Sequence, residues 1–95
     1  MARLLTKDEI RALPAGSVLW EEWICGTEPL KIEIIEHLTR NLIKTKVYID
    51  VFGKLFRFIP MQVDGTETMD LSDKEFRWWD QKPTFDEREE TPWNK

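Results

Sequence analysis

One histidine and its neighbouring carboxylates are the first place to look for chemistry in this chain. His37 follows Glu36 and lies close to Glu33, and a carboxylate-paired imidazole is the raw material of general-base catalysis. The single cysteine, Cys25, is several predicted elements away, and no third group completes a catalytic arrangement. A tetrahedral metal site draws on several Cys or His ligands. We therefore expect no enzyme activity, no cofactor and no metal site.

Tryptophan is the more informative residue type, because the chain has five of them in 95 residues. So small a core rarely needs this many large rings with polar tips, and aromatic residues are enriched where proteins bind one another. The rings are Trp20, Trp23, Trp78, Trp79 and Trp93. We expect Trp20 in the core and Trp23 nearer the surface, since they fall on opposite faces of a strand. The surplus of rings indicates a binding surface.

Composition narrows the class of protein further. The chain is 41% apolar and 34% charged with a net charge of −4, which is typical of a globular protein. Uncharged apolar runs are far shorter than the roughly 20 residues that span a bilayer, and the N-terminus does not read as a signal peptide. The lone Cys25 fits a reducing compartment. We expect a single domain over residues 1–95 in a reducing, cytoplasmic setting, with no membrane contact.

The first two thirds of the chain predict a helix followed by a meander of strands. Thr6 and Glu9 form a capping box that opens a helix over residues 7–13, ended by Pro14. Period-two patterns then predict strands over residues 17–25, 30–38, 43–51 and 55–59. Asp64-Gly65 predicts an acidic loop or a turn between residues 61–63 and 66–71.

The last quarter predicts two further short helices. Ser72 and Glu75 form a second capping box for a helix that runs through Trp79, and Thr84 with Glu87 forms a third box for residues 85–90. The fold class is therefore α+β and mostly antiparallel. We expect a small SH3-like or partly open barrel or meander with a short N-terminal helix and short C-terminal helical segments.

The C-terminal aromatic and arginine residues are the candidate protein-binding surface. On a helix, Phe76 and Trp79 would point inward and Trp78 would lie at the rim. Aromatic and arginine anchors inside a charged rim have the composition of an interface hot spot. The predicted protein-binding residues are Trp78, Trp93, Phe85, Arg77, Arg88 and Trp23. The alternative is that the tail folds back and packs on the Trp78-Trp79 doublet.

Two other kinds of binding are also compatible with the sequence. A basic strand face made of Arg40, Lys44, Lys46 and Tyr48 could hold RNA or DNA, although a solvated outer face explains the same pattern and the acidic net charge disfavours it. A homo-oligomer could instead enclose a small nucleotide-like ligand, with Arg57, Arg77 or Arg88 on its phosphate.

Both ends of the chain resemble small proteins without an assigned function that phages and prophages of Gram-positive bacteria encode. The likeness lies in residues 5–20, with a leucine-proline-x-glycine turn at 13–16, and in the tryptophan-rich residues 76–84 with Arg88 and Pro92-Trp93. Lys82 stands where these proteins usually have arginine before Pro83. The resemblance implies a non-enzymatic phage accessory protein. We expect it to bind a host, phage or defence-system protein through its Trp-rich C-terminal surface, as an inhibitor.

Overall fold

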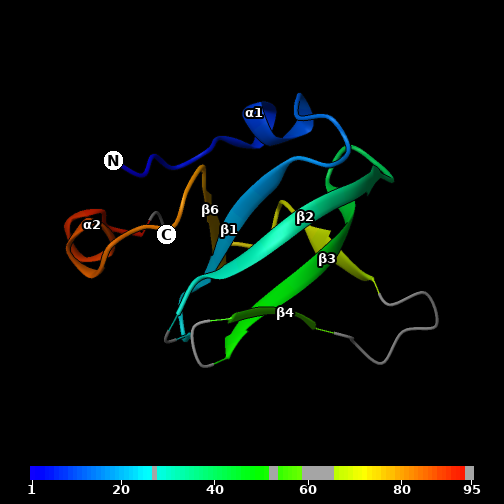
Figure 1. The fold of residues 1–95 in the computed structure, drawn as a ribbon. Helices are drawn as coiled ribbons and strands as arrows, with labels where there is room; N and C mark the ends of the chain where they lie inside the picture. Colours follow the sequence, from blue (N-terminus) through cyan, green and yellow to red (C-terminus); the bar gives the residue numbers. More distant parts are fainter. Residues whose placement is uncertain (27, 52–53, 59–65, 94–95) are drawn as a thin grey trace.

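One antiparallel sheet organises the computed structural model, which describes residues 1–26, 28–51, 54–58 and 66–93. Its strands are β1 (Val18–Trp23), β2 (Leu30–His37), β3 (Leu42–Val51), β4 (Lys54–Phe58), β5 (Glu67–Asp70) and β6 (Phe76–Trp79). They follow the order β4-β3-β2-β1-β6, and β5 also pairs with β3 (Figure 1). Two short helices, α1 (Lys7–Arg11) and α2 (Phe85–Glu90), flank the sheet. The expected α+β fold with an antiparallel, unclosed sheet is confirmed.

The hydrophobic core lies on one face of the sheet. Leu19 pairs with Ile32, and Ile32 pairs with Val47, so these side chains point to the same face. Ile10 of α1 closes the core from outside the sheet. The buried members are Ile10, Leu19, Ile32, Ile34, Ile43, Val47, Met69, Leu71 and Trp78. We call the opposite side of the sheet the outer face.

The sheet curls until β5 and β6 approach each other across the core. β5 pairs with β3 and β6 pairs with β1, and no ladder joins β5 to β6 among the described strands. A side-chain contact spans the opening instead, because the indole Nε1 of Trp78 donates to the sulfur of Met69 at 2.7 Å. The side chains of Trp78 and Met69 therefore close the base of the opening.

Most predicted elements lie where the sequence indicates. Both reciprocal capping boxes form, at Thr6 with Glu9 and at Thr84 with Glu87, and they set the starts of α1 and α2. α1 is shorter than predicted and ends at Arg11. The predicted turn at Asp64-Gly65 lies outside the described residues.

The predicted helix over residues 73–79 is wrong, because β6 occupies its second half. Ser72 does not cap a helix: its hydroxyl and its amide both donate to the Asp70 carboxylate, at 2.6 and 2.9 Å. The amide of Glu75 is taken by Asp73 at 2.9 Å. These local bonds make a turn, and the next four residues pair with β1.

The predicted core face of β1 is also wrong. Leu19 is fully buried, whereas Val18 is exposed and Trp20 is only half-buried on the outer face. Lys82 lies over the Trp20 ring at 5.8 Å from its centroid. The core side is decided by the cross-strand partner Ile32, which the pattern within one strand does not reveal.

Candidate functional site

The residues predicted to form the protein-binding surface do not make one exposed patch. Trp78 is 4% exposed and belongs to the core, which contradicts its predicted place at the rim. Phe85 on α2 is 69% exposed and Trp23 on β1 is 45% exposed. Arg77 is buried and Arg88 half-buried, and both turn to a buried carboxylate. The aromatic rings and the arginines therefore have separate roles.

Glu22 is the centre of a buried polar cluster on the outer face. Arg77 Nε lies 2.7 Å from its Oε1, and Arg88 Nε lies 3.0 Å from its Oε2. The indole Nε1 of Trp79 donates to Oε1 at 2.9 Å. The remaining Arg77 nitrogens donate to the carbonyls of Thr91 and Arg88, at 2.6 and 3.1 Å. One carboxylate thus faces two guanidinium groups, and the hydrogen bonds from Arg77, Arg88 and Trp79 compensate for its burial.

Trp93 covers the cluster from the C-terminal side. The Arg77 guanidinium lies 4.3 Å from the Trp93 ring centroid and 5.1 Å from that of Trp79, so it sits between two aromatic faces. Desolvation by burial would raise the pKa of Glu22, but the hydrogen bonds from Arg77, Trp79 and Arg88 outweigh it and leave the pKa lowered. The C-terminal tail thus packs on the sheet, in agreement with the alternative prediction that the tail folds back onto the Trp78-Trp79 doublet.

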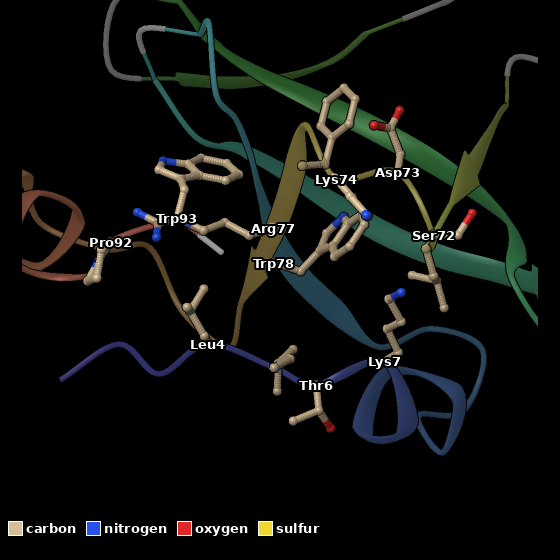
Figure 2. Close-up of a pocket in the computed structure, with 13 residues that line it drawn as sticks. Leu4, Thr6, Lys7, Ser72, Asp73, Lys74, Arg77, Trp78, Pro92 and Trp93 are labelled. Carbon is tan, nitrogen blue, oxygen red and sulfur yellow. The ribbon is translucent and has the colours of Figure 1, made fainter. Parts of the chain in front are cut away.

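A groove opens beside this cluster, above the opening between β5 and β6 (Figure 2). We call it the β6 groove. Its volume is about 460 Å³, in the range of ligand and peptide pockets. Apolar groups line much of it: Leu4, Leu5, Leu71, Phe76, Trp78, Pro92 and Trp93. Thr6, Lys7, Ser72, Asp73, Lys74 and Arg77 complete the walls.

The N-terminal segment borders the β6 groove and supplies one of its walls. The amide of Leu5 donates to the carbonyl of Trp78 at 2.8 Å, and the amide of Asp80 donates to the carbonyl of Arg3 at 3.0 Å. The segment therefore runs antiparallel along the outer edge of β6. It turns away at Thr6, where α1 begins.

Two ammonium groups point into the β6 groove from opposite sides, those of Lys7 and Lys74 (Figure 2). Neither has a hydrogen bond or an ion pair to any residue that the structure describes. The carboxylate of Asp73 is turned away from the groove and accepts from the Glu75 amide. Lys7 has only a through-space attraction to Asp70. The groove thus joins apolar walls to two cations that form no ion pair within the described part of the chain.

Trp23 forms a second, smaller feature at the other side of β6. Its ring stacks on Phe76 with centroids 6.3 Å apart and an angle of 19°, and its Nε1 donates to Glu75 at 3.2 Å. Ile24 beside it is 43% exposed. A shallow hollow of about 290 Å³ separates these residues from Trp93. The hollow is mostly polar in its lining and offers no second apolar site.

The residues predicted to bind nucleic acid lie in and next to β3. Arg40 precedes the strand, and Lys44, Lys46 and Tyr48 lie on its outer face. Acidic residues of β2 face them: Lys46 pairs with Glu33 and Lys44 pairs with Glu36. The Tyr48 hydroxyl donates to Glu33 at 3.0 Å. Opposite charges therefore alternate across this face, which is the pattern of a solvated sheet surface.

The two side chains with potential for catalysis, His37 and Cys25, do not form a common site. The His37 ring nitrogen Nε2 donates to the carbonyl of Leu13 at 2.7 Å, so this nitrogen carries the proton in that contact. Cys25 is exposed and free. Among the described residues, no group of three or more metal-ligating side chains gathers, and no helix is long and apolar enough to cross a membrane.

The residues of the candidate site that sequence reasoning missed are Leu4, Lys7, Lys74 and Glu22. Lys7 begins α1 and Lys74 lies in the turn before β6, and only the curl of the sheet brings them to one groove. A charged residue within an apolar strand is the one signal that could have singled out Glu22. No family model, no curated protein and no solved structure matches this chain.

Proposed function

We propose that this protein is a non-enzymatic binding module that takes up part of a partner protein in the β6 groove. The observation that carries the proposal is the groove itself, in which apolar walls meet two ammonium groups that have no ion pair among the described residues, beside the ion-pair cluster of Glu22. Aromatic side chains surrounded by charge are the composition of interface hot spots. A concave apolar site with few polar groups is the default place for recognition.

The packing around the groove supports a preformed site. The Glu22 cluster fixes the residues after α2, and the N-terminal segment is bonded along β6. Walls held in this way lose little conformational freedom on binding, which favours affinity. In this proposal Trp93 and Leu4 are contact residues, whereas Trp78 forms the floor.

The partner class in this proposal comes from the resemblance to phage-encoded proteins. The protein would act in the cytoplasm of a bacterial host and bind a host or defence-system protein, and it would inhibit that protein by occluding its surface. Enzyme chemistry plays no part in this function.

The two rival functions have less support in the described residues. Arg77 and Arg88, the proposed phosphate ligands of a nucleotide sponge, are both engaged by Glu22. The basic strand face is interleaved with Glu33 and Glu36, which weakens attraction for a phosphate backbone.

Site-specific photo-crosslinking tests the proposal. A benzophenone amino acid is placed at Pro92, an exposed position in the groove wall, and in a matched variant at Glu36, an exposed position at the end of β2. Both variants are incubated with a Gram-positive bacterial lysate and irradiated. We expect the crosslinker at position 92 to give one protein adduct that the crosslinker at position 36 does not give. The protein identified in that adduct, once purified, should bind the wild type but not the variant Leu4→Arg.

Equal labelling from both positions, or none from position 92 with a folded variant, would contradict the proposal. Circular dichroism of each variant establishes that it is folded. A small ligand released on heating the wild type would favour the sponge instead.

A further inference from the structure

The outer edge of β6 borders the β6 groove and indicates which part of a partner can enter it. We propose that an extended segment with alternating apolar and acidic residues adds to the outer edge of β6 as a further strand. This inference rests on the proposed function and gives its partner a chemistry.

The backbone of β6 has open hydrogen-bonding groups on this edge. Glu75 faces β1, because its carbonyl accepts from Ile24 at 2.8 Å, and Trp78 faces the outer edge, because its carbonyl accepts from Leu5. In a strand, alternate residues present both backbone groups to the same side. Phe76 and Trp78 therefore point their backbone groups away from β1, and of these groups the Phe76 amide already donates to the carbonyl of Asp73 at 3.4 Å.

The N-terminal segment uses only part of this edge. Its bonds end at the carbonyl of Trp78, since the chain leaves β6 at Thr6 to enter α1. No described residue accepts from the amide of Trp78 or donates to the carbonyl of Phe76. These two groups flank Arg77. An antiparallel added strand bonds to them through the two residues on either side of the one opposite Arg77, and a parallel strand bonds to them through a single residue.

The side chains around the edge determine what the added strand must present. Figure 2 looks onto this edge, with Leu4, Arg77 and Trp93 on one side of β6 and with Trp78, Lys7 and Lys74 on the other. Successive residues of a strand point to opposite sides. A bound strand would thus place apolar residues against Leu4 and Trp93, and acidic residues near the two ammonium groups.

Charge selects an acidic partner over a basic one. The Arg77 guanidinium is already engaged by Glu22, which also binds Arg88, and by two backbone carbonyls, so it attracts a bound carboxylate less than the two lysines do. Lys7 and Lys74 are the cations that point into the groove, and Asp73 is turned outward. Opposite charge across an interface gives specificity and fixes register.

Peptide display provides the test. A library of random linear peptides is selected on the immobilised wild type, on the double variant Lys7→Glu/Lys74→Glu and on Arg3→Ala as a surface control. Lys7 is the first residue of α1, where a negative charge suits the helix, so the double variant should fold. We expect acidic peptides with period-two apolar residues on the wild type and on Arg3→Ala, and basic peptides on the double variant.

A backbone test follows on the best acidic peptide. N-methylation of the residues whose amides face β6 should weaken binding at least about tenfold, whereas N-methylation of the intervening residues should have little effect. Enrichment of helical i, i+3 and i+4 patterns, equal enrichment of basic peptides on the wild type, no enrichment at all, or indifference to N-methylation would overturn the inference. If any of these results were obtained while the crosslinker at position 92 still gave its protein adduct, the proposed function would stand. Only the inference that the partner adds a strand to β6 would then be wrong.

Discussion

Glu21 and Glu22 are neighbours in β1, yet the fold gives their carboxylates opposite surroundings. Glu22 points to the outer face and accepts from two arginines and Trp79. Glu21 points to the core side, where Trp78 Nε1 is its neighbour at 3.3 Å. Desolvation by burial raises the pKa of Glu21, with a smaller opposing effect from the Trp78 hydrogen bond. The two residues should therefore affect stability in opposite directions as the pH changes.

Substitution of Glu22 tests the buried cluster. Glu22→Gln leaves Arg77 buried without its carboxylate, and we expect the free energy of unfolding to fall by roughly 3–5 kcal/mol at neutral pH. Because the folded pKa is lowered, the loss should shrink as the pH falls below the ordinary value of 4.5. Urea unfolding across pH measures it. The exposed control Glu36→Gln should change stability by less than about 0.5 kcal/mol, and an equal effect of both variants would contradict the cluster's role.

Substitution of Glu21 should have the reverse effect. Since the folded pKa is raised, the folded chain holds a proton that the unfolded chain releases above 4.5, so stability declines as the pH rises through that window. Glu21→Gln keeps an acceptor for Trp78 and removes the charge. We expect its Tm to exceed that of the wild type at neutral pH and to match it in mild acid. Parallel Tm curves for the two proteins would show that burial does not perturb this carboxyl.

At the scale of elements, β6 separates what the sequence could predict from what it could not. The capping boxes at Thr6 and Thr84 are local signals, and the bonds they predict form within four residues. The same signal at Ser72 failed, because Asp70 and Asp73 compete for the turn amides and β1 offers a ladder. A strand pairing across some fifty residues of sequence is invisible to a local pattern.

The same element carries a stability prediction for its buried ring. Trp78 packs with the core and contacts Met69, so Trp78→Ala should lower the free energy of unfolding by roughly 3–5 kcal/mol. Phe85→Ala, which removes an exposed ring from α2, should cost less than about 0.5 kcal/mol. Chemical denaturation of both variants decides between core and rim. If Trp78→Ala left the free energy of unfolding nearly unchanged, the ring would lie at the rim, as the sequence predicted.

At the scale of the whole molecule, the candidate site depends on the curl of the sheet. The residues of the β6 groove come from the N-terminal segment, from the link between β5 and β6, from β6 itself and from the segment after α2. The sequence indicated an open barrel-like sheet and aromatic rings near the C-terminus. It could not show that the opening of the sheet and the tail meet, because that depends on strand order and not on any one motif.

The two ends of the chain should accordingly stabilise each other. The amide of Ala2 donates to Glu87 on α2 at 2.7 Å, and the amide of Arg3 donates to Asp80 at 2.7 Å. Gln81 reaches the carbonyl of Met1 at 2.8 Å. Deletion of residues 1–4 should cost about 2–4 kcal/mol, from these bonds and the Leu4 packing.

Hydrogen exchange distinguishes this coupling from a general loss of stability. In the deletion variant the α2 amides should exchange faster, relative to those of β2 and β3, than in the wild type, because α2 buries no side chain of its own and relies on the ion-pair cluster and the N-terminal segment. Arg3→Ala keeps the backbone bonds and removes only an exposed pair with Glu9, so α2 should stay as protected as in the wild type. Unchanged relative protection of α2 after the deletion would mean that the Glu22 cluster alone holds the helix, and that the N-terminal segment serves only as the wall of the β6 groove.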